Sequence, residues 1–411
     1  MSREGAERAL SEAIDRLHAT GPRLTKRAPE DLARTLAAAW NRLADPERAL
    51  GREARDTLPD STGLSLQGVV WALNEAVRPL DEGSLSAFVE HMQPPAGCIA
   101  APARLSTMYL AGNVFTAPAA PITLALLART PVLVKASSHD DRLPRLFGQA
   151  LEAVDPVLAA SYQVVSFPGG NARLDRTAVA RADVVSAFGS DRTIQALRQH
   201  VSPTTDFIAH GHGLGMGFVP SETLSSEVQT REAAEAFALD IAAYDQRGCM
   251  SPHGVVVEGA GKAFARALCQ ALDEVAIRLP RGPLSADVGA SQMQWRGVAV
   301  ARGELFEGTT HAVAYEPSGL PVRLSPGYRN VSVVETPDPE PFVRWLASLG
   351  AHLKCVGVAG DEALRRAFAE RLPAGIAPRV CAAGAMQRPP LLSMSDGLPP
   401  WAGLQRFVQL A

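Results

Sequence analysis

Residues 98–219 alternate short apolar runs with longer amphipathic runs, and this alternation limits the chain to very few folds. The short runs predict strands at residues 107–110, 132–136, 162–167, 183–187 and 206–209. The runs between them predict helices at residues 118–129, 142–154, 174–181 and 192–200. Because strands joined by helices form right-handed crossovers, these strands are expected to lie parallel in one sheet. The segment therefore predicts a doubly wound α/β domain.

A second alternation occupies residues 220–390 and predicts a second doubly wound α/β domain. Its expected helices are 231–244, 263–277, 341–349 and 361–371, and its expected strands are 254–258, 310–315, 330–335 and 353–358. Residues 1–95 show helical periodicity and are interpreted as an N-terminal helical part of the first domain. Residues 391–411 are first Pro-rich and then apolar, which predicts a strap across a surface or an oligomer contact. The expected units are thus 1–95, 96–219, 220–390 and 391–411.

Four loops follow strands of the first predicted sheet. They contain Gly112-Asn113, residues 135–138, residues 168–170 and residues 188–190. Since ligands of such sheets bind beyond the carboxyl ends of the strands, these loops are expected to meet at one crevice. The Gly-rich runs 211–217 and 259–262 lack the spacing of a dinucleotide fingerprint or a phosphate loop, so both are interpreted as turns.

The composition argues against nucleic-acid, membrane and disulfide-rich classes of protein. The net charge of −3 comes from 40 Lys+Arg and 43 Asp+Glu, so there is no excess of basic groups for a phosphate backbone. The five cysteines form no CxxC pair, which argues against a disulfide framework or a zinc knuckle and favours a reducing cytoplasm. No apolar run reaches the ~18 residues that span a bilayer, and the N-terminus lacks the apolar core of a signal peptide. We expect a soluble cytoplasmic protein with no metal, no nucleic acid and no transmembrane segment.

Cys249 is the candidate nucleophile, because it follows a predicted helix and precedes Pro252 at the start of a predicted strand. A thiolate attacks a carbonyl carbon, so the site must lower the pKa of the cysteine or surround its sulfur with positive charge. Arg247 and nearby backbone N–H groups are the expected sources of that charge. The alternative is a buried structural cysteine, the usual role of an isolated cysteine. The other four cysteines keep this structural interpretation.

The order of motifs around this cysteine resembles that of the aldehyde dehydrogenase superfamily. The motifs are Asn113 before a helix, Val134-Lys135-Ala-Ser137 after it, Phe188-Gly-Ser190, and Cys249 preceded by Gln246. Within the superfamily the chain is similar to the LuxC-type acyl-CoA reductases, through residues 111–114, 245–252, 353–357, 379–380, 384–386, 396–397 and 404–406. The resemblance covers residues 95–411 and implies an aldehyde dehydrogenase-like fold of two Rossmann-like domains with an N-terminal helical preface.

The resemblance implies a catalytic role for Asn113. Together with the backbone N–H of Cys249, its amide would stabilise the oxyanion that forms when the thiolate adds to a carbonyl group. The alternative is that Gly112-Asn113 makes an ordinary turn after a strand.

The predicted cofactor-binding residues are Lys135, Ser137, Gly169, Phe188, Gly189 and Ser190. The resemblance implies that the Lys135 ammonium binds the adenosine ribose hydroxyls or a 2′-phosphate. The free N–H groups of the helix that follows Ser190 suit a pyrophosphate. The alternatives are an exposed strand-end lysine and an ordinary helix N-cap at Ser190. The expected cofactor is NADPH, with NADH as the alternative.

One departure from the superfamily gives the predicted reaction its direction. Aldehyde-oxidising relatives carry a glutamate at the position of residues 208–213, and this glutamate activates the water that hydrolyses the acyl-enzyme. No carboxylate occurs in this stretch, and His210 and His212 are interpreted as loop residues lining the site. Transfer of an acyl group between Cys249 and a thiol such as coenzyme A needs no activated water.

The sequence therefore predicts a homo-oligomeric enzyme that reduces a fatty acyl-CoA to an aldehyde through acyl-Cys249, with release of coenzyme A. One alternative is an acyl-phosphate reductase of the same superfamily. Clustered Arg and Lys at the acyl site would favour the phosphate, whereas an apolar tunnel would favour a fatty chain. Two further candidate functions are a non-reducing cysteine acyltransferase and a catalytically silent scaffold.

Overall fold

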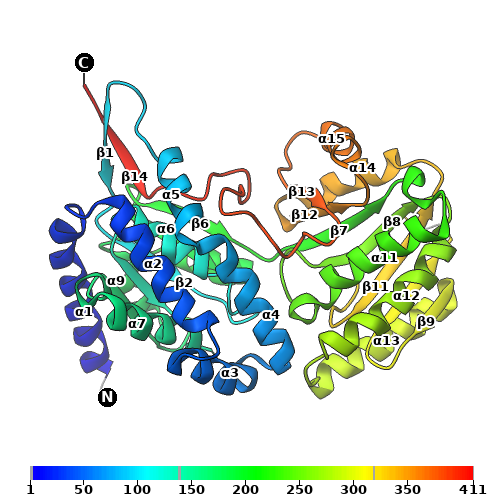
Figure 1. Ribbon diagram of the computed structural model, residues 1–411, viewed down its shortest axis with the longest axis horizontal. Coiled ribbons are helices and arrows are strands. Elements are labelled where there is room, and N and C mark those ends of the chain that lie inside the picture. Colours follow the sequence, from blue (N-terminus) through cyan, green and yellow to red (C-terminus); the bar gives the residue numbers. More distant parts are fainter. Residues whose placement is uncertain (1–2, 138–139, 318–319, 411) are drawn as a thin grey trace.

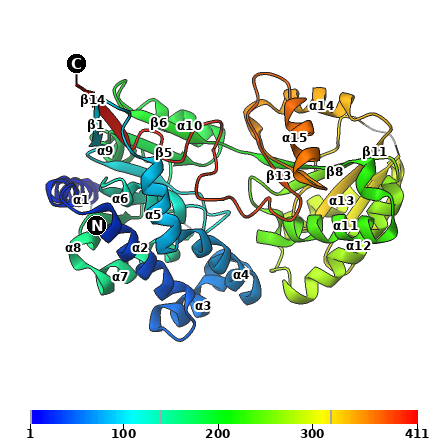
Figure 2. The same ribbon diagram turned by 45° about the horizontal axis from the view of Figure 1, so that its top comes forward.

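Two β-sheets, each packed between helices, lie side by side in the computed structural model, which describes residues 3–137, 140–317 and 320–410 (Figure 1). The first sheet and the N-terminal helices form one lobe, and the second sheet with its helices forms the other. The chain passes from the first lobe to the second between β6 (Asp206–His210) and β7 (Leu214–Val219). It returns through its C-terminal segment, which Figure 2 shows between the two lobes.

The first sheet has five parallel strands in the order β4-β3-β2-β5-β6. They are β2 (Ser106–Tyr109), β3 (Val132–Lys135), β4 (Tyr162–Val165), β5 (Val184–Phe188) and β6. Each lies within two residues of its predicted range, so the predicted parallel sheet is confirmed. The strand order reverses between β2 and β5, which is the place where ligands bind in sheets of this kind.

Helices bury both faces of this sheet. They are α1 (Arg3–Leu24), α2 (Pro29–Ala44), α3 (Ala49–Thr62), α4 (Leu66–Val77), α5 (Glu82–His91), α6 (Ala119–Leu127), α7 (Arg142–Val154), α8 (Pro156–Ala159), α9 (Ala172–Val179) and α10 (Asp191–Arg198). Val132 and Val134 share a core with α2, α6 and α7, whereas Leu133 shares the opposite core with α1 and α9. Side chains alternate along a strand, so an uninterrupted apolar strand requires cover on both sides.

The second sheet has seven strands in the order β13-β12-β7-β8-β11-β10-β9. Its other strands are β8 (Pro252–Glu258), β9 (Glu304–Glu307), β10 (Ala312–Glu316), β11 (Asn330–Thr336), β12 (Leu353–Val358) and β13 (Arg379–Ala382). Only β9 runs antiparallel to its neighbour among these paired strands. The helices are α11 (Glu227–Ala242), α12 (Gly261–Arg278), α13 (Ala286–Arg302), α14 (Glu340–Leu346) and α15 (Glu362–Glu370). The sequence did not predict α13, β9 or β13.

The boundary between the lobes differs from the prediction. The sequence predicts turns for residues 211–217 and assigns residues up to 219 to the first domain, but β7 lies inside the second sheet. A Cβ atom at Gly217 would lie 2.6 Å from the Phe237 ring. Glycine therefore serves here for close packing within a strand rather than for a turn. The boundary falls between β6 and β7.

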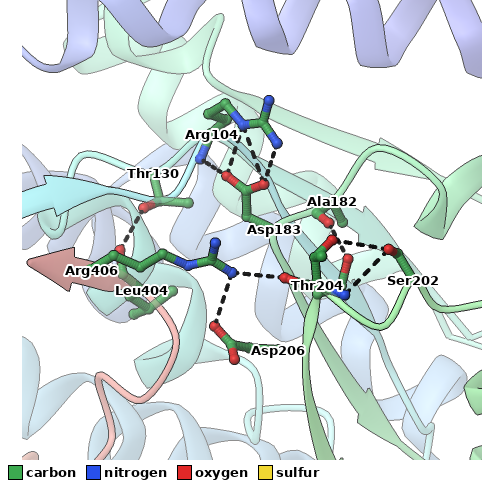
Figure 3. Close-up of polar contacts among 10 residues, drawn as sticks. Arg104, Thr130, Ala182, Asp183, Ser202, Thr204, Asp206, Leu404 and Arg406 are labelled. Atoms are coloured by element: carbon green, nitrogen blue, oxygen red, sulfur yellow. Dashed lines mark hydrogen bonds and ion pairs between the residues drawn. The ribbon is translucent and has the colours of Figure 1, made fainter.

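The C-terminal segment, predicted to be a strap or an oligomer contact, returns to the first lobe (Figure 1). Its last strand, β14 (Gln405–Gln409), pairs antiparallel with β1 (Cys98–Pro102). Arg406 Nη2 donates to Thr204 O at 2.9 Å, and Leu404 O accepts from Thr130 Oγ1 at 3.4 Å (Figure 3). These bonds fix the end of the strap to the first lobe. Across the part of the chain described, no helix has the length and apolarity needed to cross a membrane.

Candidate active site

A cavity of about 780 Å³ lies between the two lobes, at the carboxyl ends of β2, β5 and β6. Loops of the first lobe, the turn after α11 and the C-terminal strap all line it. The lining includes residues 111–114, 188–190, 210–213, 246–250 and 393–396. Two of the four loops predicted to form the crevice, those with residues 112–113 and 188–190, therefore share one cavity with the predicted nucleophile. Residues 135–137 and 168–170, from the other two loops, are not part of its lining, and residue 138 lies outside the described residues.

An unusual turn after α11 presents Cys249. Tyr244, Asp245 and Gln246 have φ values of 53°, 52° and 59°, in the left-handed region that side chains disfavour. Such a backbone costs of order 1–3 kcal/mol per residue, so the surrounding structure must hold it. Asp245 is buried and pairs with the buried Arg329, with Oδ1 2.7 Å from Nη2. The second oxygen of Asp245 accepts from Gly282 N at 3.0 Å.

Gln246 ties the turn to the second sheet. Its Nε2 donates to Pro252 O at 2.7 Å and to Asn330 O at 2.8 Å. These carbonyls belong to the first residues of β8 and β11, which are neighbours in the sheet. The turn before Cys249 is therefore fixed to the strand that follows it.

Arg247 does not supply the positive charge that the sequence predicts for it. Its guanidinium donates to Thr62 O at 2.8 Å and to Tyr244 O at 3.2 Å, so it serves the backbone. Hydrogen bonds from a charged donor are among the stronger ones, and these two hold the guanidinium in place. The cation that acts on the Cys249 sulfur is Lys354.

The electrostatics at Cys249 favour the protonated thiol. Cys249 is exposed onto the cavity, and its sulfur lies deep enough there to lose much of its water. Burial raises the pKa of Cys249, the Lys354 ammonium lowers it, and the Asp396 carboxylate raises it, with a net rise. Because only the thiolate attacks a carbonyl, this cysteine needs a base or a bound positive group to react.

Asn113 lies beside the Cys249 turn. It follows β2 in the first lobe, and its Nδ2 donates to Arg247 O at 3.1 Å in the second lobe. The amide carries a second N–H, for which no partner is found among the described residues. The structure thus brings the two predicted catalytic residues together across the lobe boundary.

The predicted cofactor residues separate into two groups. Phe188, Gly189 and Ser190 line the cavity, and Ser190 Oγ also caps α10 by accepting from Thr193 N at 3.3 Å. Lys135, Ser137 and Gly169 are not part of the cavity lining. Lys135 is the last residue of β3, Ser137 follows β3, and Gly169 follows β4.

The Lys135 side chain is buried, and it is not the exposed strand-end lysine of the alternative interpretation. Its Nζ lies 5.2 Å from the centre of the Phe167 ring. Burial lowers the pKa of Lys135, and the nearby Asp175 opposes that shift.

The sequence did not reveal that a carboxylate, Asp396, lies beside His210 at the end of β6. Asp396, on the strap, accepts from Lys354 Nζ at 2.5 Å and lies 3.7 Å from His210 Nδ1. Burial acts to raise the pKa of Asp396, but the bonds to His210 and Lys354 outweigh it and the pKa is lowered. The sequence shows 396–397 only as part of a family motif, because no local pattern reveals what lies beside Asp396 in space.

A group of potential metal ligands lies outside the cavity. Cys269, Asp273 and His311 place ligand atoms within 4.8 Å of one another. His311 Nε2 is already 3.0 Å from Cys269 O, and its Nδ1 is buried without a partner among the described residues. It is Nε2 that faces Cys269 and Asp273, so a metal bound there would leave the N–H at Nδ1 without the acceptor that a metal-bound imidazole needs. These residues therefore fit a buried hydrogen-bonded histidine better than a metal site.

A family model and several known proteins match this chain. A family model described as acyl-CoA reductase (LuxC) matches residues 55–409. A long-chain acyl-protein thioester reductase of Photorhabdus laumondii is 28% identical over 217 residues, which are 52% of this chain and 42% of that protein. A protein of the same name from Aliivibrio fischeri is 29% identical over 220 residues, 51% of this chain and 44% of that protein. The chain thus spans less than half the length of these relatives.

Solved structures show the fold. The indole-3-acetaldehyde dehydrogenase of P. syringae has a TM-score of 0.75 at 14% identity, covering 98% of this chain and 88% of its own. An aldehyde dehydrogenase from Pseudomonas aeruginosa has a TM-score of 0.75 at 15% identity, with the same coverage. The predicted aldehyde dehydrogenase-like fold is therefore confirmed.

Replacing Arg329 tests the support of the Cys249 turn. We expect Arg329→Met to lower the free energy of unfolding by about 3–5 kcal/mol, because Asp245 would stay buried without its cation. Urea unfolding measures the change. The matched control is Arg406→Met, whose partner Asp206 is exposed; it should cost less than about 1 kcal/mol. If Arg329→Met also lost less than about 1 kcal/mol, the role given to the Asp245–Arg329 pair would be contradicted.

Asp240 holds another part of the cavity wall and should make stability depend on pH. Its carboxylate accepts from Gly384 N at 2.6 Å and Met386 N at 2.9 Å, next to Gln387 in the cavity lining. Burial raises the pKa of Asp240 to about 7, although the two N–H groups oppose the shift.

In the unfolded chain this carboxyl group ionises near pH ~4, so between about pH 4 and 7 the native state binds a proton that the unfolded state has lost. We expect the free energy of unfolding of the native sequence to fall as pH rises through this window. Asp240→Asn should remove that slope. Urea unfolding at pH 5 and pH 8 measures the free energy of unfolding of the native chain and of Asp240→Asn. If that free energy changed equally with pH in both proteins, the role given to Asp240 would be refuted.

Proposed function

The chain belongs to the acyl-CoA reductase (LuxC) family, and on that premise we propose that it reduces an acyl thioester to an aldehyde with a nicotinamide cofactor through an acyl-Cys249 intermediate. The observation that carries the proposal is the contact of the Asn113 amide with the Cys249 turn, in the cavity that also contains the α10 N-terminus. A nucleophile, an oxyanion donor and a place for a pyrophosphate then share one site.

The protein's own groups act on the acyl carbon. Cys249 attacks the thioester carbonyl and expels the donor thiol, and the Asn113 amide and the Cys249 N–H stabilise the oxyanion. A nicotinamide cofactor, when bound, supplies hydride to the acyl-enzyme. The thiohemiacetal that remains on Cys249 then collapses to the aldehyde and a thiolate. Asn113 would stabilise the negative oxygen in both additions.

The acyl donor is proposed to be a fatty acyl-CoA. Apolar side chains of the first lobe and the strap line much of the cavity, among them Val114, Leu124 and Leu391, and these suit a hydrocarbon chain. An acyl phosphate would call for free cations, whereas Lys354 beside Cys249 is already paired with Asp396. The relatives' name, acyl-protein thioester reductase, makes an acyl group carried by a protein cysteine the second donor to test.

The cofactor is proposed to be NADPH, with NADH as the alternative. Lys135 ends β3 and Ser137 follows it, and both would bind the adenosine ribose or its 2′-phosphate. Gly169 follows β4, the strand that pairs with β3. Residues 136 and 137 carry no carboxylate that would repel a 2′-phosphate. Phe188, Gly189 and Ser190 would bind the pyrophosphate at the start of α10.

The chain is also proposed to form homo-oligomers. The β1–β14 pair extends from the first lobe (Figure 1), and Ile99, Phe407 and Val408 on it are exposed. Exposed apolar side chains on a free sheet edge favour contact with another chain.

Cys249→Ser tests the covalent mechanism. Acyl-CoA of several chain lengths and an acylated protein thiol are each supplied with NADPH or NADH, and nicotinamide absorbance, free thiol and aldehyde are followed. We expect aldehyde formation to fall by more than about 10³-fold in the variant, and mass spectrometry to find acyl-Cys249 only in the native sequence. The control is Cys98→Ser, which should retain activity. Full aldehyde production by Cys249→Ser would exclude the mechanism, and thiol release without oxidation of cofactor would favour an acyltransferase.

Asn113→Ala tests the oxyanion site. Loss of one oxyanion donor typically lowers kcat about 10²–10³-fold, and we expect a loss of this size with little change in KM. The control is Asn41→Ala, an exposed residue of α2. Alkylation of Cys249 by iodoacetamide checks that the nucleophile remains in place. An unchanged kcat in Asn113→Ala would leave Asn113 as a turn residue.

A further inference from the structure

Under the proposed function, the Cys249 thiol must lose its proton before it attacks. Burial and the Asp396 charge raise the pKa of this thiol, and the Lys354 ammonium only partly offsets them. A base close to the sulfur would solve this problem. The titratable and charged side chains that line the same cavity as Cys249 are Glu75, His210, His212, Tyr244, Arg247, His253, Tyr328, Lys354, Arg379 and Asp396. Lys354 and Asp396 act on the Cys249 thiol, and His210 lies beside Asp396.

Within the described chain, two of the three histidines lack the carboxylate partner that would help an imidazole to accept the proton. His253 Nδ1 lies 3.0 Å from Ser325 O, and burial lowers the pKa of His253, so its charged form is disfavoured. His212 forms no ion pair with a carboxylate among the salt bridges of the described residues. Neither side chain therefore has a partner that stabilises an imidazolium.

His210 has such a partner. Its ring stacks on Phe188, with centroids 4.2 Å apart and planes 15° apart. Its Nδ1 lies 3.4 Å from Ser395 Oγ and 3.7 Å from Asp396 Oδ2. An imidazole that uses Nδ1 in this way keeps Nε2 as the proton acceptor, and for Nε2 no hydrogen bond is found within the described ranges.

The C-terminal strap holds Asp396 in this position. Lys354 Nζ, at β12 of the second lobe, binds Asp396 Oδ1 at 2.5 Å. A Cβ atom at Gly213 would overlap the Lys354 side chain, so glycine leaves the room that this lysine occupies. The strap then continues to Arg406, which is bonded to the first lobe (Figure 3). Asp396 is thus fixed from both lobes.

We propose that His210 is the base that accepts the Cys249 proton, and that Asp396, clamped by Lys354, is the residue that positions it. Cys249, His210 and Asp396 then form a relay assembled from β6, the turn after α11 and the strap. In the forward step, the Cys249 S–H proton moves to His210 Nε2 and the sulfur forms a bond to the acyl carbon. The bond from that carbon to the donor sulfur breaks, and the departing thiolate takes the proton back from His210.

Alkylation of Cys249 by iodoacetamide between pH 5.5 and 9.5 tests the relay, with site-specific readout by mass spectrometry. It needs neither acyl donor nor cofactor, so it is independent of the substrate. We expect His210→Gln to slow alkylation at pH 7 about tenfold and to move the rise in rate to higher pH. Asp396→Asn should shift the profile in the same direction, and Asp396→Glu should restore part of the native profile.

The matched control is His352→Asn, a histidine outside the cavity lining, which should keep the native profile. If His210→Gln does not fold, as judged by circular dichroism, His210→Asn takes its place. Profiles of the His210 variants that superimpose on the native one would overturn the relay, and so would the same shift in His253→Asn but not in His210→Gln. A native chain that accepts no acyl group from any thioester would instead overturn the proposed function, while the alkylation profile would still decide the relay.

Discussion

The buried ion pair between Asp245 and Arg329 is the interaction on which the site depends. Three successive left-handed residues, 244–246, are energetically unfavourable, and only a rigid frame keeps such a turn. A buried pair adds little net stability, because both ions lose their water. It does select one geometry, since any other conformation of the turn leaves a charge buried alone. The pair therefore specifies where Cys249 points more than it stabilises the fold.

The site has no single local origin. Asn113 and His210 come from one sheet, Cys249 from the turn beyond α11, and Asp396 from the strap. Parallel sheets gather loops at their carboxyl ends, which explains the first two positions. The last two depend on how the lobes meet. Small changes in the angle between the lobes would separate Asn113 from the Cys249 turn, so the strap that joins both lobes helps to keep them in contact.

Local patterns in the sequence predicted much of the fold. All five strands of the first sheet, and helices such as α7, lie close to their predicted ranges, because apolar runs of fixed length determine them. The β7 strand was mistaken for a turn, since the glycines that suggest a turn instead allow contact with Phe237. Cys249 was singled out by its place between a predicted helix and a predicted strand, and Asn113 by the family motifs. The cation that acts on the Cys249 sulfur was not predicted correctly. It is Lys354 and not Arg247, because long-range packing decides which cation faces the sulfur.

Residues 208–213 contain no carboxylate, but the fold places Asp396 beside His210. The ion pair that Asp396 makes determines its chemical role. A general base that activates water needs a free lone pair facing the acyl carbon. Asp396 is instead bound by Lys354 and faces the His210 ring. Its ionised form is stabilised, which makes it a weak proton acceptor and a good partner for an imidazolium. Asp396 is therefore not itself placed to activate water, and its position beside His210 suits a residue that holds the imidazole ring in place.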